Sequence, residues 1–121
     1  MELLHIDGEF SVCRLRTLRP ELLAGDFCFF ARTDDEVSLV CRPERVPPDV
    51  LAREDGWKAF RVAGVLDFSL VGILAPIAVV LAEKKIGIFA VSTYDTDYIL
   101  VKSAQYERAR AALTAAGYSL R

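Results

Sequence analysis

The sequence lacks several features on which common catalytic and metal-binding sites depend. It contains one histidine, and its three cysteines, Cys13, Cys28 and Cys41, are far apart and form no Cys-x-x-Cys pair. This excludes the usual zinc and thiol redox motifs, and no Cys/His nucleophile is expected. We expect free thiols in the core, although a two-residue turn at Asp34-Asp35 would place Cys28 across from Cys41, where a disulfide could bridge them.

The sequence also lacks an excess of charge and a long apolar run. It has 15 Lys and Arg against 17 Asp and Glu, a net charge of −2, which gives no basic face for nucleic acid or an anionic membrane. The longest apolar run, residues 70–82, has 13 residues, whereas a membrane-spanning helix needs about 20. The first residues do not form a secretory signal. With 53% hydrophobic residues, the chain is expected to be a globular cytoplasmic protein.

The second half of the chain has the pattern of an α+β fold. Runs rich in β-branched and aromatic residues predict strands, and helical spacing of Tyr106, Ala109, Leu113 and Ala116 predicts a helix that Ser103 caps and Gly117 ends. The predicted order is strand, helix, strand, strand, helix, strand, over residues 60–66, 72–85, 86–93, 97–102, 103–117 and 118–120. Because Pro76 disfavours helical geometry just before it, the first helix should begin between Gly72 and Pro76. This order indicates a ferredoxin-like βαββαβ sheet with two helices on one face.

The first half offers a shorter copy of the same order. It predicts a strand at 10–15, a brief helix at 20–24 and a hairpin of strands 27–32 and 36–41, followed by a helical turn at the Pro47-Pro48 segment. Aligning the two hairpins pairs Phe30-Ala31 with Phe89-Ala90 and Leu39-Val40 with Leu100-Val101, with two extra residues in the second turn. The sequence therefore predicts two tandem units.

The hairpin at residues 86–102 is apolar on both faces. A three-residue loop, Tyr94-Asp95-Thr96, would place one group of side chains on one face and a second group on the other: Phe89, Val91, Ile99 and Val101, then Ile88, Ala90, Tyr98 and Leu100. A sheet with helices on one side normally shows water a polar second face, so we expect a second sheet, repeat or subunit to cover this one.

Two polar segments are candidate sites. The loop from Asp67 to Ile73 leads into a helix, where unpaired N–H groups favour a carboxylate, while Asp67 suits an ammonium group, so the loop fits an α-amino acid. The second is the turn from Ser92 to Tyr98, rich in hydroxyls and carboxylates. Both segments also fit a purely structural role, because Asp and Ser cap helices, glycine forms turns, and Asp and Thr bond their own backbone in turns.

The same two segments resemble the ACT domain family. Asp-Phe-Ser-Leu-Val-Gly-Ile-Leu at residues 67–74, followed by residues 88–101 with the run Ser-Thr-Tyr-Asp-Thr-Asp-Tyr, is similar to small stand-alone bacterial ACT-like proteins and to the ACT repeats of CASTOR-type arginine sensors and aspartokinases. The resemblance covers residues 60–118. It implies a C-terminal ACT domain at residues 59–121, preceded by a degenerate ACT-like unit at residues 1–58.

The resemblance implies a non-catalytic regulatory module, without cofactor or metal, that binds an amino acid between ACT units of a homodimer and acts on a regulated protein in trans. The residues that it implies as ligand-binding lie on the loop and on the facing strand: Asp67, Phe68, Ser69, Leu70, Val71, Gly72, Ile73, Ile88, Phe89, Ala90, Ser92 and Thr93. The alternative is a protein-interaction or dimerisation module that binds no ligand.

Overall fold

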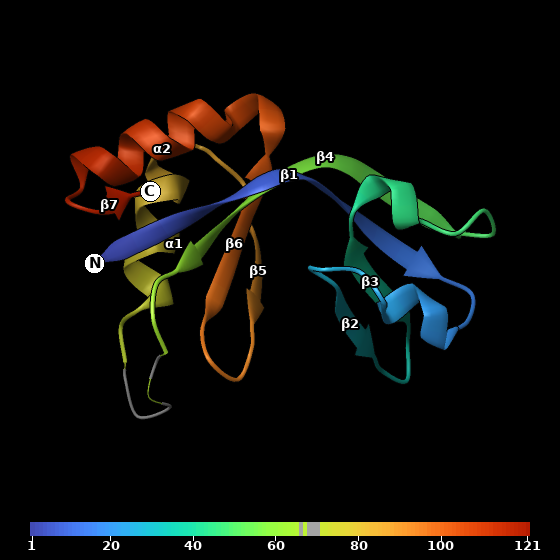
Figure 1. Ribbon diagram of the computed structural model, residues 1–121. Helices are drawn as coiled ribbons and strands as arrows, with labels where there is room; N and C mark the ends of the chain where they lie inside the picture. Colours follow the sequence, from blue (N-terminus) through green and yellow to red (C-terminus); the bar gives the residue numbers. More distant parts are fainter. Residues whose placement is uncertain (66, 68–70) are drawn as a thin grey trace. The chain divides into compact units, whose positions relative to one another are not determined.

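The computed structural model describes residues 1–65, 67 and 71–121, and its contacts divide the chain into two compact units. The C-terminal unit combines Met1–Asp7 with Lys58–Arg121, and the N-terminal unit is Gly8–Trp57. The elements, labelled in Figure 1, are β1 (Glu2–Leu15), the 3₁₀ helix η1 (Pro20–Leu23), β2 (Phe29–Arg32), β3 (Val37–Cys41), the 3₁₀ helix η2 (Pro43–Arg45), β4 (Ala52–Val62), α1 (Leu74–Glu83), β5 (Phe89–Ser92), β6 (Asp97–Lys102), the 3₁₀ helix η3 (Ser103–Gln105), α2 (Tyr106–Ala115) and β7 (Ser119–Leu120).

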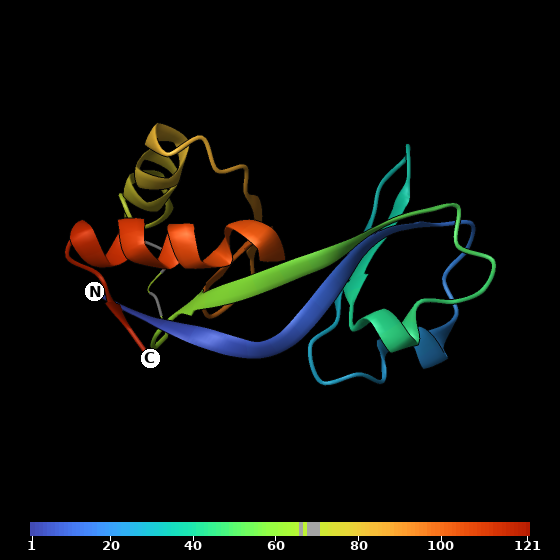
Figure 2. The ribbon, with the colours of Figure 1, turned by 90° about the horizontal axis from the view of Figure 1, so that it is seen from above.

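The C-terminal unit has helices α1 and α2 on one face of its strands (Figure 2). Its strand order is β7-β1-β4-β6-β5. Side chains from the strands and from both helices form one buried core, which consists of Leu3, Phe60, Val62, Ile77, Leu81, Ile86, Ile99, Val101, Tyr106, Ala109 and Leu113. The α+β class expected from the sequence is therefore present in this unit.

The closing strand differs from the expected four-stranded topology. β7 pairs in parallel with β1, Glu2 opposite Ser119, so β1 lies between β7 and β4. The sequence interpretation began the first strand at residue 10, but β1 starts at Glu2, and Leu3 is fully buried in the core. Because β1 is longer than the two-residue β7, it can pair with backbone N–H and C=O groups of β4 that β7 alone is too short to reach.

The helices begin and end close to where they were predicted. α1 starts at Leu74 with Pro76 in its first turn, where the missing N–H costs no intrahelical bond. α2 starts at Tyr106 without a side-chain cap among the described residues, so the expected cap at Ser103 is wrong, and Ser103 begins η3 instead. Gly117, with φ +100°, follows the end of α2, and the Tyr118 N–H bonds back to the Leu113 carbonyl.

The β5–β6 hairpin has a different register from the one expected. Phe89 lies opposite Leu100, and Thr93 N–H donates to the Thr96 carbonyl at 2.8 Å, so the loop is the two residues Tyr94-Asp95. One residue fewer in the loop exchanges the side chains of one strand between faces. The two groups are therefore Phe89, Val91, Tyr98 and Leu100 on one face, and Ala90, Ile99 and Val101 on the face with the helices.

The N-terminal unit contains strands in the order β2-β3-β1-β4 but no α-helix in its described residues. The brief helix expected at residues 20–24 is the 3₁₀ helix η1. Its core contains Cys13, Leu15, Leu22, Leu39 and Cys41. All three cysteines are free thiols, and the Cys28 thiol donates to the Leu22 carbonyl at 3.2 Å.

The two hairpins correspond to one another at a single, constant offset in the sequence. Phe29 lies opposite Val40 in the first, as Phe89 lies opposite Leu100 in the second. Both loops have two residues, so the two extra turn residues in the sequence alignment are wrong. The correspondence continues past the hairpins, because the first residues of η2 and η3, Pro43 and Ser103, are separated by the same offset.

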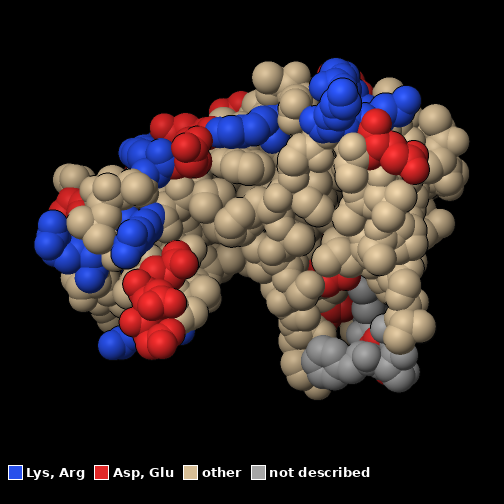
Figure 3. All heavy atoms as spheres, turned by 180° about the vertical axis from the view of Figure 1, so that it is seen from behind, with Lys and Arg blue, Asp and Glu red and all other residues tan. Residues whose placement is uncertain are grey.

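Basic and acidic side chains are mixed on the face that Figure 3 shows. Lys and Arg side chains lie next to Asp and Glu side chains there, and this face therefore offers no continuous basic surface of the kind that binds nucleic acid.

Candidate functional site

A pocket of about 350 Å³ opens in the C-terminal unit between the start of α1 and the β5–β6 hairpin. One wall consists of Asp67, the turn before α1 and the first turn of α1, and the other is the hairpin tip. Its lining residues are Asp67, Gly72, Ile73, Leu74, Ala75, Ser92, Thr93, Tyr94, Asp95, Thr96 and Asp97. The volume is at the lower end of the range of small-molecule sites.

The helix wall presents the positive end of α1. The residue before the helix, Ile73, has helical angles (φ −87°, ψ −57°) and makes no side-chain cap in the described structure. The N–H groups of the first helical turn have no carbonyl partner within the helix, and the helix dipole adds a partial positive charge. Gly72, at φ +73°, forms the sharp turn that brings these groups to the pocket, a conformation that other residues adopt at a cost. This wall therefore favours a carboxylate.

The hairpin wall is held in place by its threonines. The Thr93 hydroxyl donates to the Thr96 carbonyl at 3.0 Å, and the Thr96 hydroxyl donates to the Val62 carbonyl of β4 at 2.7 Å. Thr96 is buried although it lies beside a turn. These two hydroxyls hold the loop in place, so the purely structural role considered for this turn applies to Thr93 and Thr96. Ser92 and Asp97, next to them in the chain, also line the pocket.

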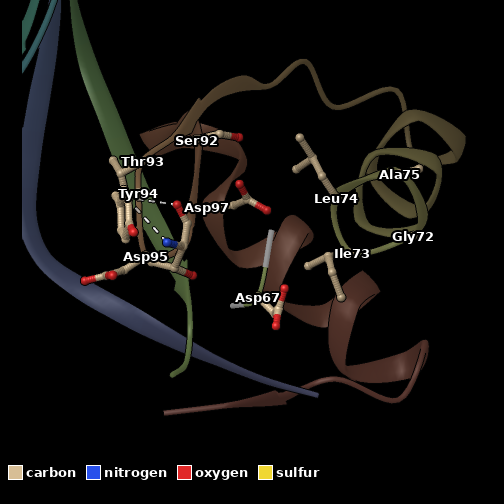
Figure 4. A pocket seen from close by; sticks show the side chains of 11 residues that line it. Asp67, Gly72, Ile73, Leu74, Ala75, Ser92, Thr93, Tyr94, Asp95 and Asp97 are labelled. Carbon is tan, nitrogen blue, oxygen red and sulfur yellow. Dashed lines mark hydrogen bonds between the residues drawn. The ribbon is translucent and has the colours of Figure 1, made fainter. Parts of the chain in front are cut away.

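The charges of the pocket side chains are all negative. Asp67, Asp95 and Asp97 line it, and its lining includes no Lys or Arg among the residues that the structure describes. Figure 4 shows the Asp67 and Asp97 carboxylates facing Ile73 and Leu74, whereas the Asp95 side chain points away from them. The Asp97 carboxylate on the hairpin wall and the N–H groups of the helix wall match the two charged ends of a zwitterion.

The sequence-based site residues are found in three places. Five line the pocket: Asp67, Gly72, Ile73, Ser92 and Thr93. Phe68, Ser69 and Leu70 lie outside the described residues. The others are not part of its lining: Val71 is exposed, Ile88 packs against the core, and Phe89 and Ala90 lie further along β5.

The structure adds pocket residues that were not among the expected ligand-binding ones. Leu74 and Ala75 come from the first turn of α1, and Tyr94, Asp95, Thr96 and Asp97 come from the hairpin. The polar run from Ser92 to Tyr98 was the available signal for the hairpin residues. Its register relative to the helix could not be obtained from the sequence, because it depends on the length of the turn.

Metal-binding geometry is not found in the part of the chain that the structure describes. No group of three His, Cys, Asp or Glu side chains there could hold a metal ion. The single histidine, His5, lies outside the pocket, with its Nδ1 2.6 Å from the Tyr106 hydroxyl oxygen.

Residues 52–115, more than half of the chain, match the family model of the ACT domain. The chain belongs to the ACT domain family. This family consists of regulatory modules that are not catalytic, and the match spans the pocket and both helices. No functionally curated protein matches the chain.

Solved structures show the same fold as this ACT domain protein. A protein of Agobacterium tumefaciens has 36% sequence identity and a TM-score of 0.89, over 99% of this chain and 91% of its own. The regulatory subunit of aspartate kinase from Thermus thermophilus, in its ligand-free form, has a TM-score of 0.63 at 10% identity, over 91% of this chain and 93% of that one. The aspartate kinase of Clostridium acetobutylicum, described as an allosteric enzyme, has a TM-score of 0.65 at 14% identity, over 88% of this chain and 32% of that one.

None of the helices in the described residues has the length and apolar composition required to cross a membrane.

Proposed function

We propose that this ACT domain protein is a cytoplasmic regulatory module that binds a free amino acid in the pocket between α1 and the β5–β6 hairpin. The observation that carries the proposal is that the first turn of α1, where Ile73 makes no side-chain cap in the described structure, faces the Asp97 carboxylate across one cavity, with the Asp67 carboxylate at its edge. A zwitterion places its carboxylate at the helix and its ammonium group at the carboxylates.

The same charges indicate the class of amino acid. In the described part of the lining there are three carboxylates and no basic side chain, so a zwitterion, whose own net charge is zero, leaves the pocket net negative. A second positive charge on the ligand side chain lowers the electrostatic energy further. We therefore infer a basic amino acid, with its side-chain cation near Asp97 or Asp67.

The match to aspartate kinase regulatory regions supports a regulatory role, since one of these structures is named as a regulatory subunit and another as an allosteric enzyme. A module without catalytic chemistry influences metabolism only if its ligand favours one association state over another. We propose that the chain forms a homodimer in which a second copy completes the wall of the pocket, and that the output reaches a regulated protein in trans.

The test is calorimetric titration of the purified protein with lysine and arginine, and with norleucine as an uncharged analogue of lysine. Lysine or arginine should bind and norleucine should bind at least tenfold more weakly, because one charge-assisted hydrogen bond contributes about 1.5–3 kcal/mol. Asp97→Asn should weaken binding by a similar factor. The matched control is Asp35→Asn in the turn of the other hairpin, which should leave binding unchanged.

Equal binding of norleucine and lysine would contradict the preference for a basic side chain but not the site. Absence of heat and of thermal shift with every common amino acid at millimolar concentration would contradict the amino-acid function itself.

The alternative is a ligand-free interaction module, which is favoured by the apolar face on which Phe89, Val91 and Tyr98 are partly exposed. Sedimentation distinguishes the two. A dimer whose association constant does not change with any amino acid supports the alternative, whereas tighter association in the presence of lysine or arginine supports the sensor.

We also propose that the N-terminal unit, Gly8–Trp57, is a degenerate ACT-like unit; residues 1–7 and 58, which the range 1–58 expected from the sequence includes, belong to the C-terminal unit. The constant offset that relates the two hairpins, and η2 to η3, supports this relationship.

A further inference from the structure

A second cavity, of about 250 Å³, lies elsewhere in the C-terminal unit and shares no residue with the pocket described above. It is lined by His5 from β1, Lys58 from β4, and Tyr106, Glu107 and Arg110 from α2, together with residues 120–121. At about 30 Å³ per water, the cavity has room for roughly eight water molecules, which suits a small ligand.

Tyr106 forms a rigid base for this cavity. Its ring stacks on the fully buried Phe60, with centroids 4.9 Å apart and an interplanar angle of 14°. Its hydroxyl oxygen is 2.6 Å from His5 Nδ1, and burial raises the pKa of Tyr106. A hydroxyl held in one place and kept protonated is a suitable hydrogen-bond donor or acceptor for a ligand.

Two cations at this cavity have no carboxylate partner in the part of the chain that the structure describes. Lys58 Nζ lies 5.2 Å from the centroid of the Tyr106 ring, and Arg110 extends from α2 one turn further on. By contrast, Arg121 at the same cavity forms an ion pair with Glu2. Arg19 likewise has a carboxylate partner, because it forms an ion pair with Asp49.

We propose that this cavity binds a phosphate dianion, either free or as a small phosphate monoester. An arginine fork and a lysine ammonium group are the usual recognition elements for phosphate oxygens, and the Tyr106 ring holds the Lys58 ammonium group at the cavity. Glu107 opposes an anion, and Asp7 lies 3.3 Å from His5 Nε2, so the site is balanced toward moderate rather than tight binding.

The proposal is independent of the amino-acid function, because the two cavities have different residues and opposite charge. Binding of phosphate should therefore persist in Asp97→Asn, the variant that weakens the amino-acid site.

The experiment is titration calorimetry at low ionic strength with inorganic phosphate and, separately, with glycerol 3-phosphate. Arg110→Gln should weaken binding at least fivefold. The matched control is Arg108→Gln, which removes the same charge from the same helix two residues away but lines another cavity, and it should change binding less than twofold. Glu107→Gln should strengthen binding, because it removes the opposing charge, and added sodium chloride should weaken it.

The two ligands distinguish the sources of the phosphate group. Tighter binding of glycerol 3-phosphate identifies a monoester site, and tighter binding of inorganic phosphate identifies a free-ion site. Absence of binding of both at about 10 mM would overturn the proposal. Equal losses in Arg110→Gln and Arg108→Gln would also overturn it, since they would show that overall charge attracts the anion.

Discussion

The two hairpins of this protein have the same turn and register, but among the residues that the structure describes it is the second hairpin that lines the pocket beside a helix start. Thr33 and Thr93 begin equivalent two-residue loops, and each N–H donates to the carbonyl three residues on. The difference lies in the partner segment. At the offset that aligns the hairpins, Gly72 and Leu74 correspond to Val12 and Arg14, which belong to strand β1 rather than to a helix start. A hairpin turn by itself is therefore not a site; the helix N-terminus opposite it is required.

The helix that follows each hairpin shows a second difference with an identifiable cause. After η3 the chain continues as α2, and Tyr106 has helical angles (φ −59°, ψ −47°). At the corresponding position Val46 is extended (ψ 125°), because it precedes Pro47. A second proline, Pro48, follows directly. These prolines prevent the N-terminal unit from forming a counterpart of α2.

Matched core truncations should show the largest difference between the two units. Ile99 and Leu39 occupy corresponding positions of the two hairpins and are both fully buried. Ile99→Ala should cost about 4 kcal/mol of unfolding free energy, because it lies in a large core under two helices that cannot collapse around the cavity. Leu39→Ala should cost about 2 kcal/mol, since its smaller cluster relaxes more easily. Urea unfolding measures both, and equal costs would contradict the comparison.

Introducing the proline of the N-terminal unit into the C-terminal one tests the explanation for α2. Glu107→Pro should destabilise the protein by about 1–2 kcal/mol, because a proline there disfavours helical geometry at Tyr106, whose ring stacks on Phe60. Far-UV circular dichroism should lose helical signal. Glu107→Ala is the control and should remain within about 0.5 kcal/mol. Unchanged helicity in the proline variant would show that the prolines are not the cause.

The hydroxyl that anchors the second hairpin should matter more than its counterpart in the first. Thr96→Val keeps the shape of the side chain but leaves the buried Val62 carbonyl without this donor, which should cost about 1–3 kcal/mol. Glu36, at the corresponding position, is exposed, and Glu36→Ala should change stability by less than about 0.5 kcal/mol. Thr96→Val should also weaken amino-acid binding in the pocket. If it preserved both stability and binding, the anchoring role would be excluded.

The smallest expected effect concerns acid stability in the N-terminal unit. Arg42 lowers the pKa of Asp26, with help from the Phe27 N–H. A carboxyl whose folded pKa is lowered stabilises the protein above its unfolded value, near 3.9, and this contribution disappears as the pH falls through the folded value. Asp26→Asn should therefore slightly lower the urea midpoint at pH 7 and have less effect below pH 3. The corresponding position of the C-terminal unit is the buried Ile86, which does not titrate. A midpoint that is the same in both proteins at pH 7 would show that the ion pair does not contribute.

Local sequence signals predicted the elements that depend on short-range physics. The C-terminal end of α2 and the start of α1 near Pro76 followed from glycine and proline geometry, and the hairpins followed from β-branched runs around polar turns. The signal was weaker wherever an element depends on a distant partner. The first eight residues of β1, residues 2–9, were missed because their alternation is imperfect, and the start of β1 lies beside β7 only through a pairing between opposite ends of the chain.

The candidate site shows the same division. Asp67, Gly72 and Ser92 could be selected from the sequence because their types suit a helix start and a polar turn. Asp97 lies in the candidate turn from Ser92 to Tyr98, but it could not be singled out within that turn. Its position at the pocket depends on a two-residue loop rather than a three-residue one, and that difference changes which face each side chain of the strand occupies.

The sequence by itself determined the α+β class, the order of the elements and the family, because these follow from periodicity, turn residues and a local motif. Only the tertiary structure decided which strand lies between β7 and β4 and which carboxylates face the start of α1. Strand order and register are set by contacts between segments far apart in the chain, and no local preference specifies them.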